Sequence, residues 1–110
     1  MALAAGDVVL VPFPFRDQLA ERTRPAVVIA AAAYNQTGDV VLAAIITHPP
    51  RGALDYALTD WQTAGLQLAS TVRMLLATAA EARVVLHIGH LSDRDWAEIQ
   101  SRVIQVFAWP

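Results

Sequence analysis

Residues 6–30 read GDVVLVPFPFRDQLAERTRPAVVIA, with two apolar runs on either side of a polar segment. The first run is rich in valine and ends at Pro12 and Pro14, which lack the N–H that a β-ladder uses. It predicts a strand that is buried on both faces. The second run, residues 26–33, has a β-branched centre that favours a strand, although its alanines leave the second half ambiguous. The stretch therefore predicts two strands joined by a polar loop.

Further strands are expected downstream of this stretch. A third apolar strand at residues 40–46 follows turn residues at 34–39, so two long strands pair as neighbours. Three shorter candidates lie at residues 54–58, 71–76 and 83–88. The residues between the last two candidates carry no clear signal.

After residue 91 the hydrophobic period changes from that of a strand to that of a helix. Ser92 and Asp95 have the spacing of a capping box, and acidic residues fill the first turn. An apolar stripe follows at Trp96, Ile99, Val103 and Val106, which predicts an amphipathic helix packed on the sheet. Many short strands and one terminal helix predict a mainly β fold: a small SH3-like barrel of antiparallel strands with a C-terminal α-helix.

The composition limits the size and the class of the protein. A chain of 110 residues has room for one domain, expected over residues 1–110. Hydrophobic residues make up 55% and charged residues 16%, which predicts an apolar surface for self-association or a partner. The net charge of −2 argues against a protein that coats duplex nucleic acid. Without cysteine, there is no disulfide, thiolate zinc site or cysteine nucleophile.

No targeting signal is recognisable in the sequence. The N-terminus lacks a basic segment, and no apolar run approaches the roughly 18 residues of a membrane span. We therefore expect a cytoplasmic protein without a membrane partner.

Polar residues at the ends of the apolar runs indicate where the function lies. The loop at residues 16–24 carries three arginines, and the third apolar strand is followed by Thr47 and His48. Guanidinium groups beside a hydroxyl and an imidazole suit a phosphodiester ligand. A local arginine cluster of this kind can hold one short strand.

An ordered set of short motifs resembles the MazF/PemK toxin family. The motifs, spread over nearly the whole chain, are Gly6-Asp7 with the following valines, Arg24-Pro25, Tyr34-Asn35, the strand ending at Thr47, Val72-Arg73, and Ile88-Gly89-His90-Leu91-Ser92 before the last helix. The resemblance implies a homodimeric toxin of a bacterial toxin–antitoxin pair with SH3-like barrel subunits. It also implies an endoribonuclease without a metal or other cofactor that cuts single-stranded RNA, usually mRNA, within a short sequence. A cognate antitoxin encoded nearby would be its partner.

In that family the arginine of the Arg-Pro pair and a hydroxyl residue at the end of the third strand carry the chemistry. These positions fall on Arg24 and Thr47. RNA cleavage without a metal can use the substrate's own 2′-hydroxyl as the nucleophile. We therefore expect Arg24 to neutralise the charge that grows on the phosphate and Thr47 to position the reacting groups, because a threonine hydroxyl is an inefficient proton carrier.

His48 is the best local candidate for a general acid or base, because imidazole carries protons near neutral pH. Adjacent strand residues point to opposite faces, so His48 and Thr47 can face one substrate only if the chain leaves the strand before Pro49. Glu21 and Asp17 are alternative acid–base partners, or they pair with arginines of their own loop in solvent.

The remaining RNA contacts are expected from arginines and aromatic residues. On the polar loop, Arg16 and Arg22 are expected to contact the RNA together with Asp17 and Glu21. Arg73 is a candidate phosphate contact or a surface cation. Leu75 stands where some relatives carry an acid, which puts any mechanism that uses that acid in doubt. Tyr56 and Trp61 either stack on bases or complete the core.

Three other interpretations of the sequence compete with this one: a metal site, a gyrase poison and a catalytically silent homologue. His87 and His90 stand three residues apart with Asp93 nearby, but a strand and a turn do not align them as metal ligands, which favours a structural role. The tail at residues 107–110 leaves open a CcdB-like toxin that traps DNA gyrase. A catalytically silent homologue that binds RNA or an antitoxin is a further alternative.

Overall fold

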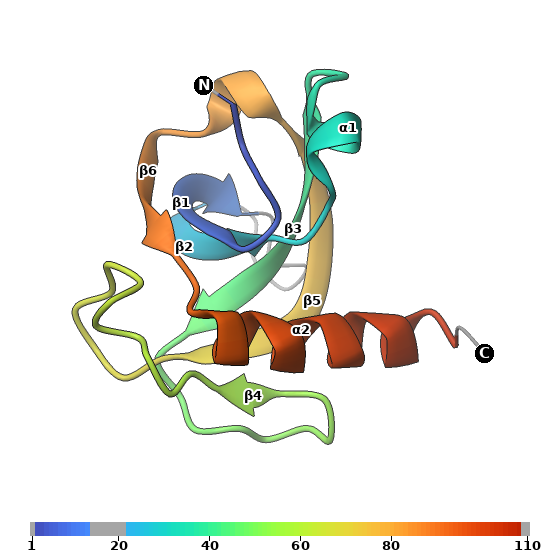
Figure 1. Ribbon diagram of the computed structural model, residues 1–110. Helices are drawn as coiled ribbons and strands as arrows, with labels where there is room; N and C mark the ends of the chain where they lie inside the picture. The colour runs from blue at the N-terminus through green and yellow to red at the C-terminus, as the bar shows by residue number, and fades with distance from the viewer. Residues whose placement is uncertain (1, 14–21, 109–110) are drawn as a thin grey trace.

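Strand pairing dominates the architecture of the computed structural model, which describes residues 2–13 and 22–108. The predicted RNA contacts Arg16, Asp17 and Glu21 lie outside these residues. The elements are β1 (Asp7–Phe13), β2 (Arg22–Val28), α1 (Ala32–Asn35), β3 (Asp39–Ile46), β4 (Tyr56–Ala57), β5 (Thr71–Ala80), a short 3₁₀ helix (Glu81–Arg83), β6 (Leu86–His90) and α2 (Asp93–Val106) (Figure 1).

The strands of the described residues form one antiparallel sheet in the order β4-β5-β3-β2-β1-β6. The sheet curls into a half-barrel, and α2 lies across one end of it beside β4 (Figure 1). Register shifts between Val8 and Val9 and between Ala43 and Ala44 interrupt the regular strand pairing, as at β-bulges, which increase the local twist and bend a strand. The predicted mainly β, SH3-like barrel with a C-terminal helix is confirmed.

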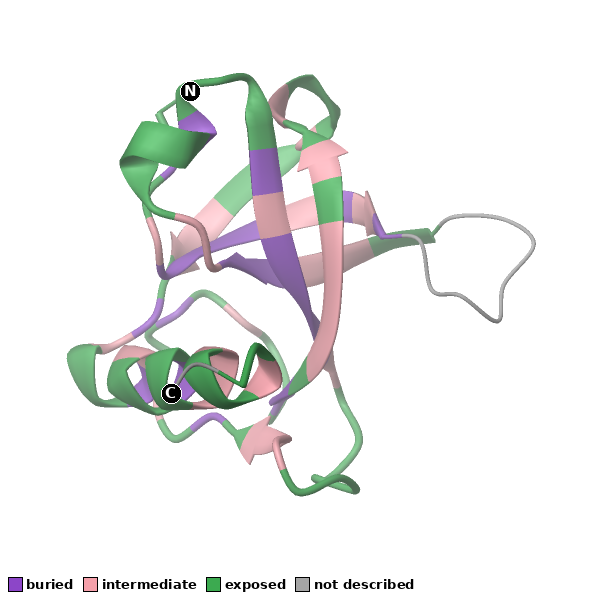
Figure 2. Cartoon of the chain, turned by 90° about the vertical axis from the view of Figure 1, so that its right-hand side faces the viewer, coloured by how far each residue is buried: buried purple, intermediate pink, exposed green. Residues whose placement is uncertain are grey.

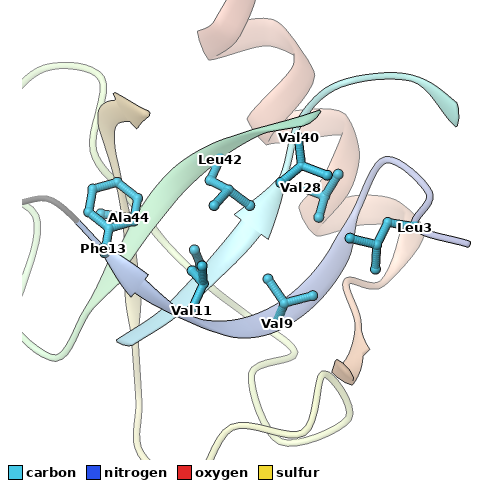
Figure 3. Packing of buried hydrophobic residues seen from close by; sticks show 9 residues of the cluster. Leu3, Val9, Val11, Phe13, Val28, Val40, Leu42 and Ala44 are labelled. Carbon is cyan, nitrogen blue, oxygen red and sulfur yellow. The ribbon is translucent and has the colours of Figure 1, made fainter. Parts of the chain in front are cut away.

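Buried side chains pack on both faces of the central strands. Because successive strand residues alternate between faces, Val9, Val11 and Phe13 join one core cluster, whereas Val8 joins the other. Figure 3 shows side chains of the first cluster pointing toward one another inside the curve of β1, β2 and β3. Figure 2 shows that the buried segments lie mainly in the middle of the strands. The expectation of a first strand buried on both faces is correct.

The predicted C-terminal helix is present and packs as its apolar stripe requires. Ser92 is the N-cap, and its side-chain oxygen accepts a hydrogen bond from the Asp95 N–H at 3.3 Å. Ile99 is fully buried, and Trp96 and Val103 pack against the second core cluster.

The structure corrects the expected bounds of the second strand. β2 starts at Arg22 and ends at Val28, and the alanine-rich part of residues 26–33 leads into α1 instead of continuing the strand. Alanine favours helix, and the side chain of Asn35 in α1 donates hydrogen bonds to the backbone oxygens of Leu3 and Ala30. These contacts tie the short helix to the N-terminal segment.

The bounds of β5 and β6 also differ from the predicted ones. β5 continues through Ala80 because β3 lies alongside it and supplies hydrogen-bond partners up to the Asp39–Ala80 pair. β6 begins at Leu86, after the chain turns through the 3₁₀ helix. Local composition could not show either shift, since both depend on the neighbouring strand.

Two glycines allow the loop before β5 to approach β6 closely. A Cβ on Gly89 would lie 2.3 Å from the backbone oxygen of Ala64, and one on Gly65 would lie 2.7 Å from the backbone oxygen of Ile88. Gly65 also has a φ of +88°, a conformation that other residues rarely adopt. This close packing holds the loop after β4 against the barrel.

Across residues 2–13 and 22–108, none of the helices combines the length and the apolar character that crossing a membrane requires.

Candidate active site

A cavity of about 630 Å³ opens where the start of β2, the end of β3 and the start of β5 meet. Its lining consists mainly of polar and cationic side chains with a few apolar ones: Arg24, Pro25, Ile45, Ile46, Thr47, His48, Arg51, Gly52, Asp55, Ser70 and Arg73. Four residues predicted from the sequence, Arg24, Thr47, His48 and Arg73, are among them.

Antiparallel pairing brings Arg24 and Thr47 to the same cavity. β2 pairs with β3 through Ala26 opposite Ala44, so the beginning of β2 lies beside the end of β3. Arg24 lies near the start of β2 and is half-buried, and Thr47 is exposed directly after β3. Two side chains far apart in sequence are thereby placed around one opening.

Thr47 and His48 both line the cavity because β3 has already ended. The strand stops at Ile46, and both residues lie in a bend before Pro49. The alternation that would point neighbours to opposite faces therefore does not separate them. The structure meets the condition under which both residues can face one ligand.

Two exposed arginines add positive charge to the cavity. Arg73 is carried by β5, where it pairs with Ala44 of β3, and Arg51 follows the two prolines after His48. Within the described part of the chain, neither guanidinium forms a hydrogen bond or an ion pair. Both groups are therefore available to an anionic ligand.

Sequence reasoning did not find Arg51, Asp55 or Ser70. The signal for Arg51 was the loop Pro49-Pro50-Arg51-Gly52, which starts one residue after His48. Asp55 closes this loop, because its Oδ2 accepts hydrogen bonds from the Arg51 N–H at 2.9 Å and the Gly52 N–H at 3.0 Å. Ser70 is buried and donates from its hydroxyl to the Leu68 backbone oxygen at 2.7 Å.

Two further predicted RNA contacts within the described residues, Arg22 and Trp61, do not line the cavity. Arg22 is exposed at the start of β2. Trp61 is half-buried and packs against the second core cluster. Their contact with RNA stays a prediction.

Tyr56 also lies outside the cavity and takes part in contacts within the protein. Its hydroxyl donates a hydrogen bond to Asp95 Oδ1 at 2.6 Å, and the Arg102 guanidinium lies 4.7 Å from the centre of its ring. Burial, together with the neighbouring Asp95 carboxylate, raises the pKa of the Tyr56 hydroxyl. Stacking of the Tyr56 ring on RNA bases stays a prediction.

His87 and His90 of β6 lie close to Asp7, an acid that the sequence pattern did not indicate as their partner. Both approach the buried Asp7 carboxylate instead of Asp93: His90 Nδ1 lies 2.8 Å and His87 Nε2 lies 3.4 Å from Asp7 Oδ1. Asp7 also accepts a hydrogen bond from the Ala4 N–H. These contacts tie β6 to the start of β1.

Leu75, at the position of the missing acid, packs against the first core cluster.

The curled half-barrel with its C-terminal helix belongs to the class of small SH3-like barrels. A family model described as the PemK-like, MazF-like toxin of type II toxin–antitoxin systems matches residues 4–107. The chain belongs to this family. No match was found among curated proteins.

Solved structures with the same fold cover nearly the whole chain. An endoribonuclease in complex with its cognate antitoxin from Mycobacterial species has a TM-score of 0.78 at 18% identity, covering 99% of this chain and 98% of that one. The MazE–MazF complex (Form-III) from Deinococcus radiodurans has a TM-score of 0.79 at 17% identity, covering 100% of both chains. Toxin MazF-mt6 from Mycobacterium tuberculosis has a TM-score of 0.76 at 15% identity, covering 94% of this chain and 98% of that one.

Proposed function

We propose that this toxin is an endoribonuclease that cleaves single-stranded RNA within short sequence motifs, without a metal, at the cavity between β2, β3 and β5. The observation that carries the proposal is that Arg24 and Thr47 line one cavity with Arg51 and Arg73, whose guanidinium groups have no partner among the described residues. A structurally similar protein that carries the name endoribonuclease supports it. The guanidinium, hydroxyl and imidazole groups that line the cavity also support it.

The reaction starts at the 2′-hydroxyl of the nucleotide before the cleaved bond. Its oxygen attacks the adjacent phosphorus, and negative charge grows on the non-bridging oxygens. Arg24 donates hydrogen bonds to these oxygens, and one such donor contributes about 2.7–4 kcal/mol to lowering the barrier. Thr47 positions the 2′-hydroxyl or the phosphate through its own hydroxyl.

The leaving 5′-oxygen needs a proton as its bond to phosphorus breaks. His48 lines the cavity beside Thr47, and imidazolium is a suitable donor near neutral pH. We assign His48 to this role. The products are a 2′,3′-cyclic phosphate and a free 5′-hydroxyl.

The charges that line the cavity support a short unpaired strand as the ligand. Three arginines and one histidine face a single carboxylate among the described lining residues, while the whole chain has a net charge of −2. A local cationic opening on an acidic protein holds a few phosphates and does not favour coating of a duplex. Single-stranded mRNA is therefore the proposed substrate.

The partners follow from the family and the surface. The similar structures from Mycobacterial species and Deinococcus radiodurans include complexes with an antitoxin, named MazE in the second case. We propose that a cognate antitoxin covers the cavity of this toxin and that two copies form a homodimer. Exposed apolar residues such as Val85, Leu86 and Phe107 are compatible with such interfaces.

The decisive experiment compares Arg24→Ala with the wild type on a long unstructured RNA, with 5′ ends mapped and EDTA present. Wild-type protein should cut at a short motif, and the variant should lose at least about 100-fold in single-turnover rate while remaining folded and dimeric. Arg83→Ala is the matched control, because Arg83 is exposed and does not line the cavity. Full activity of Arg24→Ala would refute the assignment.

A truncation separates this function from gyrase poisoning. Removal of the last two residues, Trp109 and Pro110, should leave RNA cleavage intact. Loss of toxicity in the truncated protein, with RNA cleavage unchanged, would instead favour the gyrase-trapping alternative.

A further inference from the structure

Asp55 is the only carboxylate among the described residues that line the cavity. It is half-buried and lies on the loop between β3 and β4, which the proposed mechanism does not otherwise use. A carboxylate weakens the attraction of this cationic cavity for a phosphate, so its placement there calls for a function. Its hydrogen bonds indicate what that function is.

The position of the carboxylate is set by the protein itself. Oδ2 accepts the Arg51 and Gly52 N–H groups, and the Asp55 N–H donates to the Gly52 backbone oxygen at 3.2 Å. These three hydrogen bonds close the loop into a small ring. The carboxylate therefore does not depend on a ligand for its placement.

The second oxygen of the carboxylate remains available. Within the described residues Oδ1 of Asp55 accepts no hydrogen bond, although guanidinium groups line the same cavity. An anchored carboxylate with one open oxygen can accept a proton. In the proposed reaction, the proton that lacks an acceptor is that of the 2′-hydroxyl.

We propose that Asp55 is the general base of the RNA cleavage, an inference that rests on the proposed function. The 2′-oxygen forms a bond to phosphorus while its proton moves to Asp55 Oδ1. The bond from phosphorus to the 5′-oxygen breaks, and that oxygen takes a proton from the His48 imidazolium. Proton transfer through water then restores both residues for the next turnover.

The test uses Asp55→Asn, because an amide oxygen can still accept the two N–H groups that close the loop but cannot take the proton. The substrate is a short RNA with one mapped site. The same RNA with a 2′-deoxy nucleotide at that site measures affinity without cleavage. Asp39→Asn is the matched control, since Asp39 is exposed on β3 and does not line the cavity.

We expect Asp55→Asn to lower the single-turnover rate at saturating protein by at least about 100-fold, with affinity for the 2′-deoxy RNA within about twofold of the wild type. Asp39→Asn should match the wild type in both measurements. A rate for Asp55→Asn near that of the wild type overturns the proposal. A loss of affinity without a loss of rate at saturation also overturns it, because the residue then only closes the loop.

The pH dependence of the wild-type protein gives a measurement that does not rely on any variant. A general base makes the rate fall by about tenfold per pH unit on the acid side of the optimum. A cleavage rate that stays constant below the pH optimum overturns the proposal even if Asp55→Asn fails to fold. If the wild type cleaves RNA and Arg24→Ala does not, the endoribonuclease assignment stands whatever Asp55 does.

Discussion

The Tyr56 hydroxyl on β4 donates a 2.6 Å hydrogen bond to Oδ1 of Asp95, a fully buried carboxylate in the first turn of α2. The same carboxylate accepts the backbone N–H groups of Thr59 at 3.1 Å and Asp60 at 2.8 Å. β4 follows directly on the loop that carries Asp55. Asp95 therefore joins the C-terminal helix to the segment that follows the Asp55 loop.

Replacing this buried carboxylate should destabilise the fold. Asp95→Ala leaves three donors without their acceptor, so we expect the free energy of unfolding to fall by about 2–3 kcal/mol. Tyr56→Phe removes one of the three bonds and should cost about 1 kcal/mol. Urea unfolding followed by circular dichroism measures both values. Equal stability of Asp95→Ala and the wild type would contradict this role.

A surface ion pair beside Asp95 should make stability depend on acid pH. Hydrogen bonds from Arg94 and Ser92 lower the pKa of the Asp60 carboxyl from 3.8 to about 2. Because the folded-state pKa lies below the unfolded one, the stabilisation is complete above pH 3.8 and is lost as the pH falls through about 2. The effect is small, because the pair is exposed to solvent.

A carboxyl ¹³C NMR titration checks this behaviour directly. In Arg94→Ala the pKa of Asp60 should move up toward its ordinary value, and the acid loss of stability between pH 4 and 2 should become shallower. An Asp60 pKa that is the same in Arg94→Ala and in the wild type would show that Arg94 is not the cause.

Arg51 and Arg73, whose guanidinium groups have no partner within the described part of the chain, should control the salt dependence of RNA binding. Arg51→Ala and Arg73→Ala should each weaken binding of a 2′-deoxy-blocked RNA across sequences. Each should also reduce the slope of log affinity against log salt by about 0.7, the value for one phosphate contact on a single strand. Fluorescence anisotropy at several salt concentrations measures the slope, with Arg83→Ala as the control. An unchanged slope would exclude that arginine from phosphate contact.

Local sequence patterns correctly predicted the elements whose structure depends mainly on their own residues. The valine run of β1 and the apolar strand β3 have the alternation or continuous burial that a sheet requires, and Ser92 with the stripe beginning at Trp96 is sufficient for α2. The predictions for the alanine-rich segments were ambiguous or had the wrong bounds. The weak conformational preference of alanine is easily overridden by a neighbouring strand. Hence α1 and the second half of β5 depended on contacts beyond their own residues.

The sequence by itself determined the class of fold, the family, and the two residues Arg24 and Thr47 that belong to the family's ordered motifs. Only the tertiary structure decided that both share a cavity with Arg51, Asp55 and Ser70, and that Tyr56 bonds to Asp95. Hydrophobic periodicity extends over a few neighbouring residues, so it can be recognised from the sequence alone. A cavity depends on strand register and on the path of a loop, which bring distant residues together only once the sheet has closed.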